Sequence, residues 1–565
     1  MTLQKKIKEL STQYKIVAEV NLDDWHEMVD YQTKNWFRKI LTDIHKKKYE
    51  SDERIIFTLT RGDRYANGST IAGAVLIQLQ KRLNEVDISN FFVILLTNDT
   101  TIPIAYSQVK DSISTDPVPI NIIVYEETIT GKIISSVKKF NSNSVDPIKI
   151  SLDTLETQEQ FLLTKSKIFC MYPWIHMHTR PDGNAYLCCA ADTVFPIGNC
   201  KTNTMQEIWN DRPMRESRND MLPEKSINAC NRCYEQEASG FMSSRLSANE
   251  QHGHHIKKVA ATKEDGTVDN FELTYWDIRF SNLCNLSCRS CGHILSSSWY
   301  QDQAKLSGPE WKKTHKVLNY AGRFEIDAWE QLVEHIDHVE QIYFAGGEPL
   351  LMEEHYNILE ELVRRERFDV RLIYNTNFTH TDLKGRSVFE YWKQFRSVAV
   401  GASLDGMGHP AEYIRKGTNW YDVVKNRHEM LRVCPNVDFY VSPTLSILNA
   451  WHLPSFHREW TAAGLIRAQD LNVNILQDPA YYRIDIAPAD YKIRLEARYR
   501  DHIDNWLAGQ DPLQRATVGF ESAITFMNST DNTQLIDTFW RKTHELDSIR
   551  NEIWSDVLPE LKALL

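Results

Sequence analysis

The stretch RFSNLCNLSCRSCGH, residues 279–293, places Cys284, Cys288 and Cys291 close together in a chain that has ten cysteines. The three thiols directly follow an apolar run, so we expect them at the carboxyl end of a strand, where barrel active sites are built. A structural zinc site needs four ligands, and His293 lies too close to Cys291 for the usual spacing. On a [4Fe–4S] cluster, three thiolates would leave one iron open to a non-protein ligand.

The region around this loop repeats a strand-then-helix pattern. Six short apolar runs alternate with longer stretches of helical periodicity, such as EEHYNILEELVRRERF at 353–368. The runs are LTYWDIRF (273–280), VEQIYFA (339–345), DVRLIYN (369–375), SVAVGASL (397–404), VDFYVSPTL (437–445) and DLNVNIL (470–476). Six βα units predict an α/β fold over residues 271–478, with a parallel sheet that is either open or curved into a partial (β/α)6 barrel.

The spacing Cys-x3-Cys-x2-Cys resembles the signature of the radical S-adenosylmethionine (SAM) superfamily, and the resemblance covers roughly residues 271–478. After the second predicted strand comes FAGGEPLL (344–351), which resembles the glycine-glycine-glutamate motif of that family. YNTNF (374–378) follows the third strand and ASLDG (402–406) follows the fourth. With these motifs at successive strand ends, zinc or unrelated thiols become a much weaker interpretation of the trio.

The resemblance implies a SAM-binding role for several motif residues. Gly346 and Gly347 would let the backbone approach the methionyl amino group, with Glu348 beside it. The other implied contacts are Asn377, Ser403 and Asp405 for the ribose and polar groups, and Arg415 for the methionyl carboxylate.

One position departs from the family pattern. Members often carry an aromatic residue just before the third cysteine to pack on the adenine, whereas this chain has Ser290. Adenine packing must then come from elsewhere, with Trp299 and Phe344 as candidates. The sequence identifies no catalytic general base or hydrogen donor.

The implied chemistry follows from the open iron. SAM would chelate that iron, an electron from the reduced cluster would cleave the sulfonium, and the resulting 5′-deoxyadenosyl radical would abstract a substrate hydrogen. The protein would position one C–H bond and exclude water and oxygen. The need for a low-potential electron implies a flavodoxin- or ferredoxin-type reductant.

A second set of four cysteines lies upstream of the trio. The set is Cys170 and Cys188 in CMYPWIHMHTRPDGNAYLC (170–188), and Cys230 and Cys233 in CNRC (230–233). A hairpin turning at Gly183 would bring the first two thiols together, and four thiolates would fully ligate one auxiliary [4Fe–4S] cluster. A zinc site has the same ligand count, and spacing alone does not exclude it.

This upstream segment resembles the SPASM and twitch domains, which are auxiliary-cluster modules of radical SAM enzymes, and IGNCKTNTMQEIWND (197–211) resembles their next segment. A two-cluster SPASM domain needs further cysteines after CNRC, and none follows before the trio. A single cluster, as in a twitch domain, is therefore the economical interpretation. With no open iron, that cluster would transfer electrons rather than ligate substrate. Its position before the barrel resembles the N-terminal-twitch radical SAM proteins.

The remaining cysteines have ordinary interpretations. Cys189 or Cys200 could replace an auxiliary ligand, but both are more simply small buried residues, and Cys434 is expected to be a free core thiol.

Outside the two cysteine regions, residues 1–150 predict a small α/β domain of unknown role. Its strands are expected at RIIFTLT (54–60), FFVILLT (91–97) and PINIIVYEE (119–127), with a helix at 69–86. RGDRYANGS (61–69) lacks the spacing of a phosphate loop and is expected to be a turn.

The other boundaries follow from composition. The twitch-like domain is predicted at 165–245, and the polar stretch at 246–270 reads as a linker or surface loop. Its histidines His252, His254 and His255 could bind metal, but a solvated loop is the favoured interpretation. Residues 485–565 predict a helical C-terminal extension.

Charge and hydropathy exclude several classes of protein. The net charge of −11 argues against general binding of nucleic acid or anionic membranes. The longest apolar runs, IAGAVLI and FFVILL, are far shorter than the roughly 20 residues of a membrane span. We therefore expect a cytoplasmic protein.

Three functions remain open at this stage. The chain could modify a peptide or protein side chain, with residues 1–150 recognising the substrate. It could instead dehydrogenate or epimerise a small carbohydrate or nucleotide-type metabolite. A zinc-stabilised scaffold without SAM chemistry is the third, and both the trio and GGEP argue against it.

Overall fold

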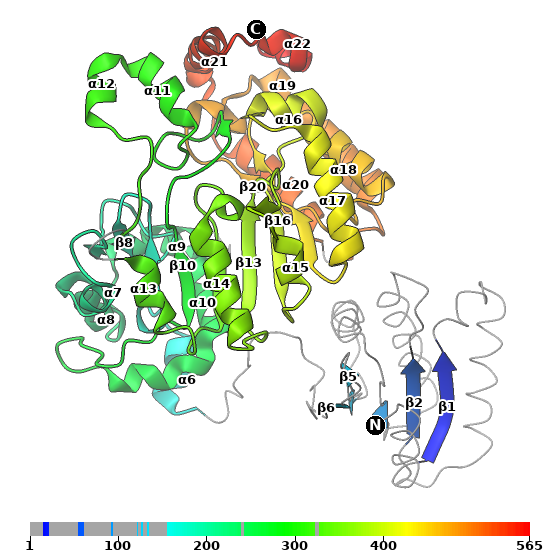
Figure 1. Ribbon diagram of the computed structural model, residues 1–565. Coiled ribbons are helices and arrows are strands. Elements are labelled where there is room, and N and C mark those ends of the chain that lie inside the picture. The colour runs from blue at the N-terminus through cyan, green and yellow to red at the C-terminus, as the bar shows by residue number, and fades with distance from the viewer. Residues whose placement is uncertain are drawn as a thin grey trace. The chain divides into compact units, whose positions relative to one another are not determined.

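The computed structural model describes residues 155–238, 242–322, 327–512 and 514–565, together with the backbone of six strands between residues 15 and 134. The chain divides into two units, Met1–Pro147 and Ile148–Leu565 (Figure 1). Each unit has its own strands, so the two are described separately.

In the first unit, three of the segments predicted as strands contain strands. They hold β2 (Ile55–Thr60), β3 (Phe92–Val93), and β4 (Asn121–Ile122) with β5 (Glu126–Glu127). β2 pairs in parallel with β1 (Lys15–Asn21), a strand that the apolar pattern does not predict. β3 pairs in parallel with β4, and β5 pairs in antiparallel fashion with β6 (Ile133–Ile134). The predicted helix at 69–86 and turn at 61–69 lie outside the described residues.

The second unit is built on a large parallel sheet. Five strands run parallel in chain order, each inside one predicted strand. They are β10 (Tyr275–Ile278), β12 (Gln341–Phe344), β13 (Arg371–Thr376), β16 (Val398–Ala402) and β18 (Asp438–Val441). Beyond β18, β19 (Thr444–Leu445) pairs in parallel with β20 (Asn474–Ile475), which lies in the sixth predicted strand. The α/β fold is confirmed, while closure into a partial barrel stays a prediction.

The sheet has one face covered by helices and one face that lines a cavity. In β13, Leu372 and Tyr374 are fully buried, whereas the alternate residues Ile373 and Asn375 line the cavity. Side chains along a strand point alternately to its two faces, so this pattern shows that the two faces of β13 meet different surroundings. Tyr374 packs on Trp392, with ring centroids 5.0 Å apart.

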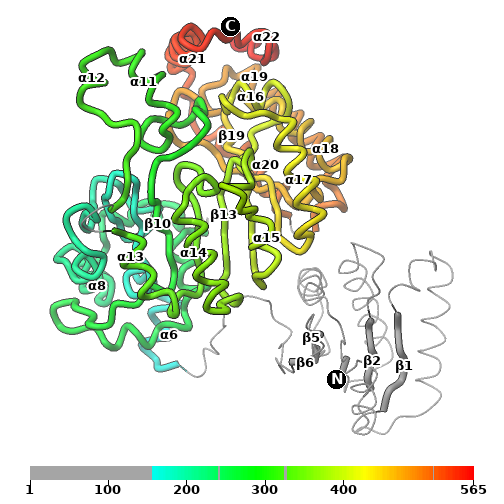
Figure 2. The backbone as a smooth tube through the Cα atoms, in the orientation of Figure 1, coloured from blue at the N-terminus to red at the C-terminus, as the bar shows by residue number. Residues whose placement is uncertain are grey.

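The covering helices follow the strands in the order that the repeat predicts. α14 (Glu353–Arg364), α15 (Val388–Trp392) and α17 (Trp420–Val433) come after β12, β13 and β16, and they lie along one side of the sheet (Figure 2). α18 (Leu453–Ala462) comes between β19 and β20. The strand-to-helix turns therefore gather at one edge of the sheet.

The cysteine-rich segment extends this same sheet. β7 (His176–Thr179) pairs in parallel with β10, β8 (Asn184–Tyr186) turns back on β7, and β9 (Gly198–Asn199) pairs with β8. The turn between β7 and β8 has Gly183 at φ +92°, a conformation that favours glycine. The predicted hairpin is thus present, and it shares backbone hydrogen bonds with the sheet.

The prediction of a linker or loop at 246–270 is wrong for its first half. α10 (Ser244–His252) and the 3₁₀ segment η4 (Gly253–Ala261) fill it, and the Ser243 side chain caps α10 by accepting from the backbone of Leu246 at 3.1 Å. Ile256 is fully buried. A few apolar side chains pack this polar stretch against the cysteine-rich segment. They are too few to make its average composition apolar, so a prediction from composition misses them.

The predicted C-terminal extension is helical. It contains α19 (Ala489–Asp501), α20 (Arg515–Ser529), α21 (Ile536–Arg550) and α22 (Trp554–Val557), with a π-helical turn at His502–Leu507. α21 lies beside α11 (Trp299–Ser307), the helix that follows the cysteine trio (Figure 1). Among the described residues, no helix is both long and apolar enough to cross a membrane.

Candidate functional site

The cysteine trio lies in the loop between β10 and α11. Cys288 belongs to the short strand β11 (Ser287–Cys288), which pairs with β17 (Arg415–Lys416) so that Cys288 faces Arg415. The loop backbone is held on both sides, since Trp299 donates its indole N–H to the carbonyl of Cys288 at 2.7 Å and Ser298 donates to that of Cys284 at 2.7 Å. These bonds use carbonyl groups and leave the sulfurs available.

The surroundings of the trio keep the thiols protonated unless a cation is bound. Burial raises the pKa of Cys284 and of Cys291 to about 12, and it also raises the pKa of Cys288. The guanidinium of Arg415, with Nη1 at 3.8 Å from the Cys288 sulfur, opposes that rise. Metal binding would supply the positive charge that makes three buried thiolates stable.

The Gly-Gly-Glu turn packs directly against the segment that leads to Cys284. Gly346 and Gly347 have φ values of +83° and +55°. A Cβ on Gly347 would lie 2.4 Å from the carbonyl oxygen of Leu283, and the backbone N–H of Glu348 donates to that same oxygen at 2.7 Å. Only glycine permits this approach, so the two motifs predicted from the sequence form one structure.

Glu348 is buried, and much of its hydrogen-bonding capacity is already used. Its Oε1 accepts from the backbone of Leu350 at 3.1 Å and from the Thr376 hydroxyl at 2.7 Å, while Oε2 accepts from the backbone of Asn377 at 2.7 Å. Burial raises the pKa of Glu348 to about 7. Oε2, with one protein donor, keeps a lone pair for an amino group.

Asp405 and Arg415 form a buried pair at the edge of the same site. Nε and Nη2 of Arg415 lie 2.8 and 2.9 Å from the two carboxylate oxygens of Asp405. Asp405 also accepts from the backbone of Thr444 at 2.8 Å. The carboxylate therefore orients Arg415, while the direct contact of Asp405 with SAM that the resemblance implies stays a prediction.

Asn377 and Ser403 lie in different environments. The Asn377 amide donates to Asn285 Oδ1 at 2.9 Å and accepts from the Thr379 hydroxyl at 2.7 Å, which ties β13 to the residue after Cys284. Ser403 instead lines the open cavity on the sheet face. The Ser403 N–H donates to the Thr376 carbonyl at 2.8 Å, so the two residues lie at neighbouring strand ends while their side chains meet different surroundings.

Both candidates for adenine packing are already covered by protein. Trp299 is 6% exposed, and the guanidinium of Arg550 lies over its ring with 5.0 Å to the centroid. Phe344 is 4% exposed and stacks on Tyr374 at 4.9 Å. Neither ring offers a free face in this structure. Neither is therefore placed to pack on adenine in place of the aromatic residue that this chain lacks at Ser290.

An open cavity of about 450 Å³ lies against the sheet face opposite α14, α15 and α17. Its walls combine tyrosines, amides and small hydroxyl side chains from both ends of the sheet. They are Tyr172, Gln251, Tyr275, Gln341, Tyr343, Ile373, Asn375, Ser403, Tyr440, Ser442, Thr444, Asn472 and Asn474. Among the described residues, no charged side chain lines the cavity. Tyr172 and Gln251 come from segments before β10 and carry no local sequence signal.

The four upstream cysteines line one cavity. Cys170, Cys188, Cys230 and Cys233 share its wall with Arg245. Burial raises the pKa of Cys230 to about 12 and that of Cys188 well above its usual value. Four thiols around one space are the donor set of a fully ligated iron–sulfur cluster or of a zinc ion.

The remaining cysteines lie apart from both sets. Cys200 and Cys434 are buried in the main apolar core, as expected, whereas Cys189 is exposed, which differs from the buried position predicted for it. None of the three lines the cavity of the four upstream thiols.

A buried charged group lies where β7 meets β10. Asp277 is fully buried, with His178 Nδ1 at 2.9 Å from its Oδ2 and Arg279 Nε at 2.8 Å from its Oδ1. A Cβ on Gly346 would lie 2.5 Å from the Arg279 side chain. This group therefore connects the cysteine-rich hairpin to the Gly-Gly-Glu turn, and the charged residues within the apolar run at 273–280 were a signal for it.

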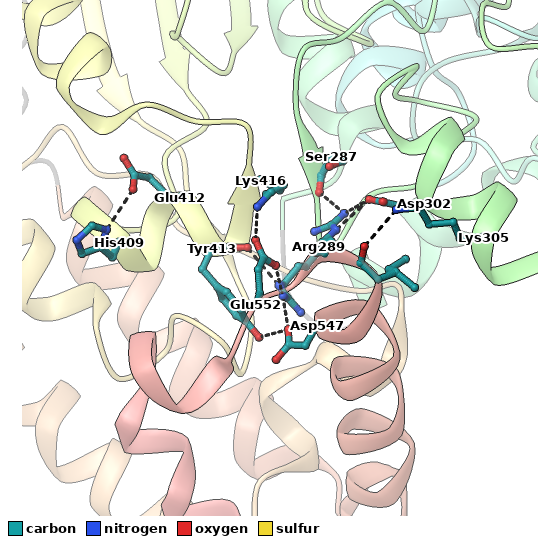
Figure 3. Close-up of polar contacts among 12 residues, drawn as sticks. Ser287, Arg289, Asp302, Lys305, His409, Glu412, Tyr413, Lys416, Asp547 and Glu552 are labelled. Atoms are coloured by element: carbon teal, nitrogen blue, oxygen red, sulfur yellow. Dashed lines mark hydrogen bonds and ion pairs between the residues drawn. The ribbon is translucent and has the colours of Figure 1, made fainter.

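The C-terminal helices hold the trio loop through Arg289. This residue follows Cys288, is 2% exposed, and donates to the carboxylates of Asp547 and Glu552 and to the carbonyl of Tyr413 (Figure 3). Its guanidinium lies 3.6 Å from the centroid of the Tyr413 ring. Since Asp547 belongs to α21, the loop geometry depends on a helix far along the chain.

Arg550 of α21 makes a second attachment. It donates to the carbonyl of Ser287 at 2.7 Å and to Asp302 at 2.9 Å, while Lys305 of α11 donates to the carbonyl of Ile549 at 3.2 Å. α21 thus contacts both β11 and the helix that follows the trio.

Comparison with known proteins identifies the upstream segment. Residues 170–234 match SPASM, described as an iron–sulfur cluster-binding domain. The match includes all four cysteines of the upstream cavity and confirms the prediction of an auxiliary iron–sulfur domain of the SPASM kind. No curated protein matches this chain.

Solved structures give weaker likenesses. Native anSMEcpe with bound AdoMet is 20% identical over 40% of this chain and 60% of its own chain, with a TM-score of 0.28. Native anSMEcpe with bound AdoMet and Cp18Cys peptide is 19% identical over 40% and 59%, with a TM-score of 0.27. This chain thus spans less than two thirds of those neighbours, and at such TM-scores the likeness carries no argument about arrangement or activity.

Proposed function

We propose that this chain is a radical SAM enzyme that binds a [4Fe–4S] cluster at Cys284, Cys288 and Cys291 and an auxiliary [4Fe–4S] cluster at the four upstream cysteines. The observation that carries the proposal is the direct packing of the trio loop on the Gly-Gly-Glu turn, through Gly347 and Leu283. The SPASM match supplies the auxiliary domain that such enzymes carry.

When bound, the clusters and SAM would supply reductive cleavage to a 5′-deoxyadenosyl radical and transfer of the remaining substrate electron. The chain's own residues would hold and orient these groups. Arg415, fixed by Asp405, would meet the methionyl carboxylate, and Gly346 and Gly347 would receive the amino group beside Glu348. The enzyme would act as an oxidoreductase or as a modifying enzyme.

Metal content tests this proposal first. After anaerobic reconstitution, two [4Fe–4S] clusters require about eight irons and eight sulfides per chain. Replacing Cys284, Cys288 and Cys291 with Ala should remove about four irons and abolish 5′-deoxyadenosine formation with dithionite. Stoichiometric zinc without visible absorption would instead favour the scaffold, and 5′-deoxyadenosine formation by the triple variant would exclude this site.

For the substrate we propose a peptide or protein side chain, as many SPASM-bearing relatives use, with residues 1–150 recognising it. The second candidate, a small carbohydrate or nucleotide-type metabolite, is favoured by one observation. The cavity against the sheet presents hydroxyl and amide side chains beside tyrosines, and no charged group lines it among the described residues. Such walls suit a neutral, hydroxyl-rich or amide-bearing group better than a phosphate or a charged side chain.

The two candidates can be separated by measuring how fast the chain forms 5′-deoxyadenosine with and without each class of substrate. We expect the rate of 5′-deoxyadenosine formation to rise when the true substrate class fills the cavity, so a panel of neutral sugars and nucleosides should be compared with a panel of short peptides. Acceleration by the peptide panel alone would exclude the metabolite. A cytoplasmic location and a flavodoxin- or ferredoxin-type reductant belong to the same proposal.

A further inference from the structure

Two adjacent histidines and one carboxylate converge on a point outside both cysteine sites. His254 Nε2 lies 2.8 Å from Oε2 of Glu340, and His255 Nε2 lies 3.0 Å from the same oxygen. The three candidate ligand atoms lie within 4.8 Å of one another. The histidines belong to η4, in the stretch predicted as a linker, and Glu340 directly precedes β12.

The convergence is unusual because adjacent side chains ordinarily point in different directions. Here the His254 and His255 rings have centroids 4.0 Å apart at an interplanar angle of 42°, so both present Nε2 to one oxygen. In a metal site with bonds of about 2.1 Å, neighbouring ligand atoms lie about 3.0 to 3.4 Å apart. The separations of 2.8 and 3.0 Å to Glu340 are close to that range, so small side-chain shifts would admit an ion.

Glu340 stands on fixed backbone, and the group of three side chains faces an accessible side. Glu340 donates its N–H to Thr274 at 2.8 Å, and its carbonyl accepts from Arg371 at 2.8 Å, so neighbouring strands hold it. The histidine side chains are 9% and 12% exposed and that of Glu340 is 41% exposed. A site of this kind is preorganised on the protein side and open to water ligands on the other.

We propose that His254, His255 and Glu340 bind a borderline divalent transition-metal ion, with Zn²⁺ as its representative. Two imidazole nitrogens and one carboxylate oxygen suit zinc or a neighbouring first-row ion, whereas Mg²⁺ and Ca²⁺ prefer oxygen ligands alone. The ion would join the helical segment 244–261 to the sheet. That segment supplies Gln251 to the cavity wall, and His252 beside it stacks on Tyr275 of the same wall with ring centroids 5.4 Å apart.

Calorimetric titration of Zn²⁺ into the full-length, cluster-loaded protein tests this site. We expect one zinc per chain, with affinity lowered by more than about tenfold in Glu340→Gln and in His254→Gln, because each removes a ligand. His338→Ala is the matched control, since it removes an exposed imidazole two positions before Glu340 and should leave the affinity unchanged. Absence of binding, or equal binding by wild type and both ligand variants, would overturn the proposal.

A zinc K-edge absorption spectrum of the same sample distinguishes this site from stray binding to thiols. We expect nitrogen and oxygen neighbours at about 2.0 to 2.2 Å and no sulfur neighbour at about 2.3 Å. A sulfur shell would place the metal on cysteines and exclude the histidine site. The iron content should stay constant through the titration, because the zinc would not displace iron from the cysteines. Both readouts report zinc binding alone, so they do not depend on whether the chain cleaves SAM.

Discussion

Gly347 is the residue on which the contact between the trio loop and the Gly-Gly-Glu turn depends most directly. A Cβ there would meet the Leu283 carbonyl at 2.4 Å and the Met352 methyl at 2.9 Å. The first neighbour is backbone that leads into Cys284, so it cannot move without moving the cysteine. Gly347→Ala should therefore displace the trio and lower iron from about eight to about four per chain, measured after reconstitution.

Gly385→Ala is the control for that variant. Gly385 also has a positive φ, +82°, but a Cβ there meets nothing within 4 Å. Both substitutions place a side chain on left-handed backbone, at a cost of about 1 to 2 kcal/mol, and only Gly347→Ala adds the clash. Equal iron contents in the two variants would show that the contact with Leu283 does not position the cluster loop.

Glu348 should make the stability of the cluster-free chain depend on pH. Burial raises its pKa in the folded state to about 7, above the usual 4.5 of a glutamate, so between these two pH values the folded state binds a proton that the unfolded state has released. The free energy of unfolding should then fall as pH rises from about 4.5 to about 7, by at most about 3 kcal/mol. Glu348→Gln should flatten this part of the profile, measured by urea unfolding at several pH values.

The comparison with the variant isolates this one carboxyl group. Other titrating groups contribute to both profiles, so the difference between wild type and Glu348→Gln is the informative quantity. A difference that stays constant from pH 4.5 to 7 would mean that Glu348 titrates normally in the folded chain.

At the scale of helices, α21 holds the trio loop through Arg289. Arg289 is fully enclosed between Asp547, Glu552 and Tyr413 (Figure 3). Removing one carboxylate leaves a buried cation with a single anionic partner, and breaking a buried ion pair in this way destabilises proteins by about 3 kcal/mol. Asp547→Asn should therefore lower the free energy of unfolding by about this amount and alter the EPR spectrum of the cluster proposed at the trio.

The auxiliary cluster signal serves as an internal reference for Asp547→Asn, since the four cysteines proposed to ligate that cluster belong to the cysteine-rich segment. Glu216→Gln provides the matched control, because Glu216 is paired with Arg212 on the surface, with side chains 58% and 79% exposed. Exposed pairs contribute less than about 1 kcal/mol. If the trio cluster keeps its spectrum while stability falls, α21 stabilises the fold without positioning the loop.

The elements that sequence predicts correctly are those whose signal is local. The trio occupies one short loop, and the strands are continuous apolar runs, so both can be recognised from neighbouring residues. Asp547 is 258 positions from Arg289, and no local pattern connects them. The stretch at 246–270 is mispredicted as a linker for a related reason, because buried Ile256 and Val259 are sparse among polar residues.

For the candidate site residues, too, sequence reveals local motifs but not contacts between distant segments. Motif resemblance finds Glu348, Asp405 and Arg415, but not that Asp405 is occupied by Arg415 or that Glu348 accepts three hydrogen bonds. Those facts depend on strands that only the folded sheet brings together. Gln251 and Tyr172 line the cavity for the same reason, since the sheet places their segments beside β10.

For the whole molecule, the decisive feature is that one sheet joins the cysteine-rich hairpin to the strands that carry the trio. β7 pairs with β10 along four residues, from Tyr275 opposite His176 to Ile278 opposite Thr179. Both cysteine sets lie within the unit Ile148–Leu565, whereas Met1–Pro147 forms a separate unit. The clusters should therefore depend on the second unit alone.

A chain of residues 148–565 should bind about eight irons and form 5′-deoxyadenosine from SAM and dithionite at the full-length rate, because every proposed cluster and SAM ligand is retained. Iron analysis and product quantification on the two proteins provide the measurement. Within the shorter chain, heat should unfold the hairpin and the parallel sheet in one transition, since they share backbone hydrogen bonds. Loss of the trio cluster on truncation, with the auxiliary cluster retained, would instead show that residues 1–147 help to build the SAM site.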